Sequence, residues 1–113
     1  MLLDYIVDFC NREYQNADTN HVCDNCTHPQ GCSGGCAFCL NEVHFPDGDP
    51  DGKKEYDCKN ILDYYVCRYS HKYCSEVEYA LGTVEDLKKL SEFNVMSIGC
   101  GATPDLMALE CLL

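Results

Sequence analysis

Apolar side chains in the first part of the chain recur at intervals of three or four residues, the spacing of one face of an α-helix. They are Leu3, Ile6, Phe9 or Cys10, and Tyr14. This pattern predicts an amphipathic helix over residues 3–15. The polar stretch 16–20 follows and should end it.

The longest helical pattern runs over residues 57–81, and Gly82 after it is a natural helix stop. Its apolar positions lie on or near one stripe: Ile61, Leu62, Tyr65, Val66, Tyr69, Tyr73, Val77, Ala80 and Leu81. Thr83, with Asp86 three residues later, resembles a capping box and predicts a short helix through Leu90.

The C-terminal part reads as a strand, a turn and a helix. Residues 94–98 form an apolar, partly β-branched run that predicts a buried strand. A Gly-x-Gly turn follows, and then Thr103 as a helix N-cap and Pro104 as the first helical residue. The predicted helix covers residues 105–113 and would bury one side, consisting of Leu106, Leu109 and Leu113.

Between the predicted helices, residues 21–46 are rich in Cys, Gly and His and show no periodicity. The whole chain has 11 cysteines in 113 residues, an odd number that leaves one thiol unpaired in any complete disulfide scheme. The N-terminus carries Asp4 and Asp8 where a secretory signal would carry basic and apolar residues. A reducing, cytoplasmic setting is therefore expected, and there closely spaced cysteines usually bind metal.

Two C-x-x-C pairs, separated by nine residues, form the centre of the cysteine-rich segment. Each pair can bind one ion with two thiolates, and together they complete the tetrahedral S4 shell that structural zinc prefers. The expected zinc ligands are Cys23, Cys26, Cys36 and Cys39. Cys32, His44 and Cys58 are further candidates, either as ligands of a second ion or within a different ligand subset.

An alternative to zinc comes from the spacing Cys32-x-x-x-Cys36-x-x-Cys39, with Phe38 before the last cysteine. This spacing resembles the cluster motif of radical SAM enzymes, which implies a [4Fe–4S] cluster. The chain is far shorter than the barrel of that family, and the resemblance leaves Cys23 and Cys26 without a role.

The net charge of −11 disfavours nucleic acid as a partner, because affinity for the phosphate backbone depends on Lys and Arg. The segment 64–73 is an exception in composition, with four tyrosines besides Arg68 and Lys72. A ladder of exposed charges, in which Arg68, Lys72 and Glu76 are one turn apart, is the simpler explanation of its basic residues.

The segment 95–106 resembles motif I of class I SAM-dependent methyltransferases. Gly99 and Gly101 match the glycine turn that follows the first strand of that family, whereas Ser97 or Ile98 replaces the usual acidic residue. The resemblance implies that these glycines would bind SAM in a longer parent protein, because this chain ends before any further βα unit.

The sequence thus predicts a mainly α fold with a metal-stapled, irregular Cys-rich segment and a terminal βα unit. Residues 1–92 would form a helical zinc-binding module, and residues 93–113 the first strand and helix of a methyltransferase-like domain. The module would position a substrate or a protein partner, with one or two zinc ions and no membrane. The alternative is a stand-alone zinc adaptor that acts through protein contacts.

Overall fold

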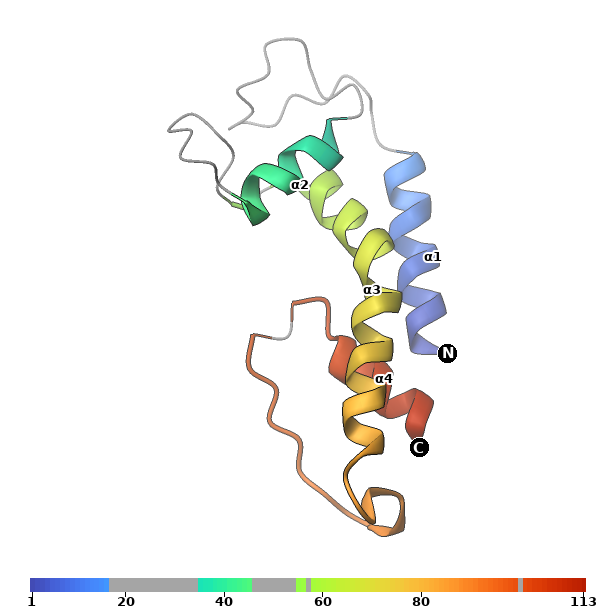
Figure 1. The fold of residues 1–113 in the computed structure, drawn as a ribbon. Coiled ribbons are helices and arrows are strands. Elements are labelled where there is room, and N and C mark those ends of the chain that lie inside the picture. Colours follow the sequence, from blue (N-terminus) through green and yellow to red (C-terminus); the bar gives the residue numbers. More distant parts are fainter. Residues whose placement is uncertain (17–34, 46–54, 57, 100) are drawn as a thin grey trace.

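The computed structural model describes residues 1–16, 35–45, 55–56, 58–99 and 101–113, and within this part the protein is mainly helical, as predicted (Figure 1). No β-strand occurs among these residues. The helices are α1 (Leu2–Gln15), α2 (Cys36–His44), α3 (Lys59–Gly82) and α4 (Pro104–Leu112), and a 3₁₀ turn, η1 (Leu87–Lys89), follows α3.

Helix α3 is the centre of the fold, because α1, α2 and α4 all pack against it (Figure 1). α1 runs antiparallel to it. Near the end of α1, Glu13 pairs with Lys59 in the first turn of α3, whereas Leu3 at the start of α1 packs with Cys74 further along α3. Three partners on one helix explain why no single apolar stripe accounts for its burial.

One core cluster joins α1, α3 and α4 around Leu3, Cys74, Met107 and Ala108, all of which are buried. Val77 and Leu81 of α3 and Cys111 of α4 pack against these residues. The helix predicted to open a second domain therefore shares its core with the helices of the first.

A second core cluster joins α2 to the beginning of α3. Its buried members are Cys39, Leu40, Cys58 and Ile61. Val43 and three tyrosines of α3, namely Tyr64, Tyr65 and Tyr69, cover it.

Helix α2 corrects the prediction that the whole Cys-rich segment is irregular. Residues 36–44 form a regular helix, and Leu40 on it is almost fully buried. The helix is too short to be stable alone, so its packing on α3 accounts for its formation. No local periodicity could have signalled it.

The predicted short helix over 83–90 is reduced to the turn η1. The Thr83 hydroxyl donates a hydrogen bond to the Ala80 carbonyl oxygen at 2.6 Å, so it caps the end of α3 and does not begin a new helix. Asp86 has φ of 65°, a left-handed conformation that cannot continue a regular helix.

Residues 94–98 do not form the predicted strand in this structure, and Met96 and Ile98 are largely exposed. A strand needs a neighbouring strand to satisfy its backbone N–H and C=O groups. The described residues contain no strand that could pair with residues 94–98. The apolar composition of this run predicted burial, which the fold described here does not provide.

Helix α4 begins at Pro104, with Thr103 as its N-cap residue, close to the predicted start. Its buried residues are Met107, Ala108 and Leu109. Leu106 and Leu113, which the periodicity assigned to the buried side, are exposed. The helix docks between α1 and α3, so the buried face depends on where it crosses α3.

Candidate functional site

Three of the predicted metal-ligand cysteines lie at the N-terminal ends of helices. Cys36 is the first residue of α2, Cys39 lies one turn later, and Cys58 is the N-cap residue of α3. All three side chains are buried. The positive end of a helix stabilises a nearby thiolate, which is the form of cysteine that binds metal.

The structure brings Cys39 and Cys58 into the same buried cluster, although 18 residues separate them in the chain. Cys36 lies three residues before Cys39 on α2, and this spacing places both on one side of the helix. Cys58, which the sequence offered only as a surplus ligand, therefore shares a buried cluster with Cys39 of the second C-x-x-C pair.

The remaining cysteine candidates, Cys23, Cys26 and Cys32, lie outside the described residues. In the described part of the chain, no three His, Cys, Asp or Glu side chains form a group that could hold a metal ion.

His44 is at the opposite end of α2 from Cys36, and aromatic rings surround it. The ring centroids of Tyr69, Tyr65 and Tyr56 lie 5.6, 5.8 and 5.8 Å from that of the imidazole, and Phe45 lies at 6.1 Å. His44 is five positions after Cys39 on the helix, or about 7.5 Å along the axis. In this structure His44 is thus part of an aromatic cluster.

The aromatic cluster continues along α3 through Tyr65, Tyr69 and Tyr73. Consecutive rings lie 5.3 and 5.6 Å apart, and Tyr69 and Tyr73 are nearly stacked, with an interplanar angle of 22°. Burial, more than the neighbouring phenols, raises the pKa of Tyr65. The spacing of four residues between these tyrosines was visible in the sequence, but only the position of α2 shows which rings meet.

The predicted charge ladder on α3 forms only in part. Lys72 Nζ lies 3.8 Å from Glu76 Oε1, whereas the Arg68 guanidinium lies over the ring of Tyr69, 5.7 Å from its centroid. Arg68 also lines a small cavity of about 110 Å³ with His44 and Asn41.

Most of the cysteines outside the predicted ligand set lie on helices α1, α3 and α4. Cys10 and Cys74 are buried, Cys67 and Cys111 are half-buried, and Cys100 is outside the described residues. Burial is the main cause that raises the pKa of Cys10 to about 11, and the nearby Asp63 carboxylate raises it further. Such a thiol stays protonated at neutral pH, which suits a small apolar core residue and not a metal ligand.

The glycine turn borders a cavity of about 390 Å³ between α3 and the residues that lead into α4. Gly99 and Gly101 have φ of 66° and 54°, values that favour glycine. The Tyr65 hydroxyl lies 4.0 Å from the point where a Cβ on Gly101 would be. α3 therefore supplies a wall to this turn that the strand–turn–helix pattern did not predict.

Two carboxylates from different helices line this cavity, Glu76 of α3 and Asp105 of α4. The Ser97 hydroxyl is the main cause that holds the pKa of the Asp105 carboxyl below its usual range, so this group is ionised at neutral pH. Asp105 Oδ1 is nevertheless shielded from solvent and makes no hydrogen bond.

Comparison of the chain with protein-family models, with curated proteins and with solved structures finds no match. In the described part of the chain, no helix has both the length and the apolar character that crossing a membrane requires.

Proposed function

We propose that this protein is a zinc-binding helical module that positions a protein partner or a substrate. The observation that carries the proposal is the placement of Cys36, Cys39 and Cys58, all buried, at the N-terminal ends of α2 and α3. Helix N-termini favour thiolates, and four thiolates around one ion form the shell typical of structural zinc.

In this proposal, Cys23 and Cys26 complete the zinc shell with Cys36 and Cys39. The ion would tie the segment containing Cys23 and Cys26 to α2, and through the packing of α2 to α3. Metal binding would also relieve repulsion in a chain of net charge −11. Cys58 would support the site from α3, or join Cys32 and His44 in a second one.

Metal analysis of the purified protein tests the proposal. We expect colourless protein that contains zinc. Each of the variants Cys23→Ser, Cys26→Ser, Cys36→Ser and Cys39→Ser should lower the zinc content. Cys111→Ser, a half-buried thiol on α4, is the matched control and should keep the wild-type content.

Iron with acid-labile sulfide and visible absorption would overturn the zinc assignment in favour of a radical-SAM-like cluster on Cys32, Cys36 and Cys39. If Cys111→Ser lost zinc as readily as Cys36→Ser, the ligand set would be wrong. Two zinc ions per chain, one of them lost in Cys58→Ser, would assign Cys58 to a second site.

A second candidate concerns residues 93–113, as the first βα unit of a SAM-dependent methyltransferase-like domain. Three observations favour it: the exposed apolar side chains of Val95, Met96 and Ile98, the positive φ of Gly99 and Gly101, and the helix that begins at Pro104. A neighbouring strand from further sequence or from another chain would bury residues 94–98.

Hydrogen exchange tests this second candidate. If further sequence of the same gene supplies the neighbouring strand, the amides of residues 94–98 should be protected in the longer product and exchange fast in the 113-residue chain. Equal, fast exchange in both would contradict the candidate.

A further inference from the structure

We propose that the cavity between α3 and the start of α4 binds a small organic ammonium compound through Asp105 and Glu76, with its apolar part against Tyr65 and Val77. This site is distinct from the proposed metal centre, and its test does not depend on zinc. Four observations carry the inference.

The first observation is the size and the lining of the cavity. A volume of about 390 Å³ is within the range of small-molecule sites. Tyr65, Tyr73 and Val77 of α3 form one side, and Pro104 of α4 contributes to the other. These side chains offer apolar and aromatic surface to an aliphatic chain.

The second observation is the charge of the cavity. Among its described lining residues, Glu76 and Asp105 are the charged ones, and none is Lys, Arg or His. The polar groups that remain, the hydroxyls of Ser97, Tyr65 and Tyr73, can accept hydrogen bonds. A ligand that brings a positive charge and N–H donors therefore complements the site.

The third observation is the unpaired oxygen of Asp105. Oδ1 is shielded from solvent without a hydrogen-bond donor, although buried polar atoms in proteins nearly always have a partner. An ammonium N–H is the kind of group that satisfies an ionised carboxylate, whereas an anion or an aliphatic group does not.

The fourth observation is that the protein already places an ammonium at this rim. Lys72 Nζ lies 3.8 Å from Glu76 Oε1 and 5.4 Å from the centroid of the Tyr73 ring. Both side chains of the pair are well exposed, so the interaction is weak and a ligand can replace it. Lys72 thus acts as an internal competitor for Glu76.

Titration of the wild-type chain with cadaverine, followed by calorimetry and by NMR, tests the site. We expect saturable binding of the diamine and none of 1,5-pentanediol, which has the same length without charge. Asp105→Asn should weaken binding about tenfold or more, because it removes one charge-assisted contact. Glu76→Gln should weaken it less, and Lys72→Met should strengthen it.

Glu85→Gln is the matched control, since it removes the same charge from an exposed residue outside the cavity. This control distinguishes binding of cadaverine in the cavity from general electrostatic attraction of a cation to an acidic protein. Equal affinities of Asp105→Asn and Glu85→Gln, equal binding of the diol, or no saturable binding would each overturn the proposal. If Asp105→Asn lost its helical circular dichroism, the other two variants would still test the site. Glu76→Gln should weaken cadaverine binding and Lys72→Met should strengthen it, and any other result would overturn the proposal.

Discussion

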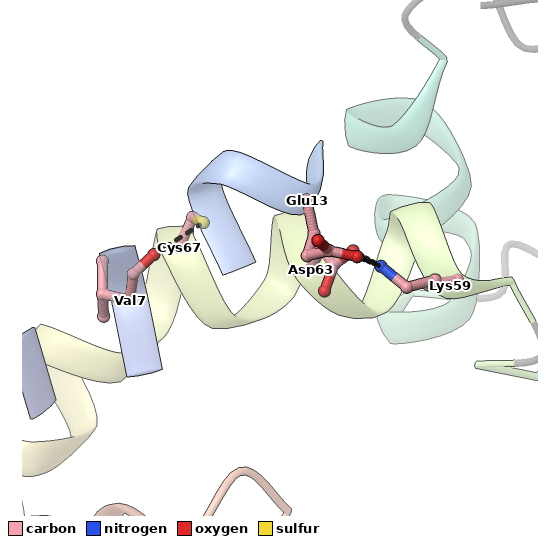
Figure 2. A network of polar contacts seen from close by, with 5 residues as sticks. All are labelled: Val7, Glu13, Lys59, Asp63 and Cys67. Atoms are coloured by element: carbon pink, nitrogen blue, oxygen red, sulfur yellow. Dashed lines mark hydrogen bonds and ion pairs between the residues drawn. The ribbon is translucent and has the colours of Figure 1, made fainter. Parts of the chain in front are cut away.

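Lys59 Nζ at the start of α3 lies 2.8 Å from Glu13 Oε2 near the end of α1 (Figure 2). This ion pair links the two antiparallel helices at one end. Lys59 Nζ also lies 2.8 Å from Asp63 Oδ2, one turn along α3. The side chain of Asp63 is only 10% exposed, so Lys59 is the partner that compensates a nearly buried carboxylate. The hydrogen bonds that Lys59 Nζ donates to Asp63, and then to Glu13, are the main causes that raise the pKa of Lys59.

This arrangement predicts unequal effects for two lysine substitutions on the same helix. Lys59→Met should clearly lower the free energy of unfolding, because it leaves the Asp63 carboxylate without its cation. Lys72→Met removes an exposed pair with Glu76 at 3.8 Å and should have almost no effect. Urea unfolding of both variants checks the order, and equal stabilities would contradict the role given to Lys59.

The docking of α4 can be tested with two adjacent residues. Met107 is 0% exposed in the core shared by α1, α3 and α4, whereas Leu106 beside it is 47% exposed. We expect Met107→Ala to lower stability by about 2–5 kcal/mol, because it leaves a cavity. Leu106→Ala should change stability by less than about 1 kcal/mol. The opposite order in thermal unfolding would show that α4 docks by its other face.

Burial of Cys10 predicts a loss of stability in alkali. Its pKa is raised from 9.0 to about 11, first by burial and then by Asp63. Well below pH 9 the thiol is protonated in both the folded and the unfolded state. Between the two pKa values the unfolded state loses the proton first, so stability falls as the pH rises. The urea concentration at the midpoint of unfolding should change less between pH 8 and pH 10 in Cys10→Ala than in the wild-type protein.

An equal drop in the two proteins would show that the Cys10 thiol does not contribute to this pH dependence. The tyrosines and lysines also titrate in alkali, but they are present in both proteins. The comparison therefore isolates the effect of Cys10.

SAM itself should not bind to this 113-residue chain at micromolar concentrations. Gly99 and Gly101 supply only the turn that would hold the methionine part, and the cavity beside it, of about 390 Å³, is near the lower end of the range for small-molecule sites. An incomplete site loses much of its affinity, because the translational cost of association does not decrease. Calorimetric titration checks this expectation. Saturable micromolar binding would mean that the turn and α3 already form a complete site.

The local sequence was sufficient to place α1, α3 and α4. Their boundaries follow from periodicity, from Gly82 at the end of α3 and from Pro104 at the start of α4, which act within one or two helical turns. The C-x-x-C spacing also predicts which thiols would share an ion. The ligand assignment itself stays a prediction, since Cys23, Cys26 and Cys32 lie outside the described residues.

The tertiary structure decided which faces are buried and which residues meet. Three helices pack against α3, so its buried residues do not follow the single apolar stripe that the sequence predicts. They are Ile61, Asp63, Ser70 and Cys74. Packing on α3 explains how the short segment Cys36–His44 is helical, and it places Cys39 in the same buried cluster as Cys58. Residues 94–98 form no strand, because a strand depends on a neighbour that their own sequence cannot supply. The sequence by itself determines the local helical periods, while burial and the cavity at Asp105 depend on contacts between segments far apart in the chain.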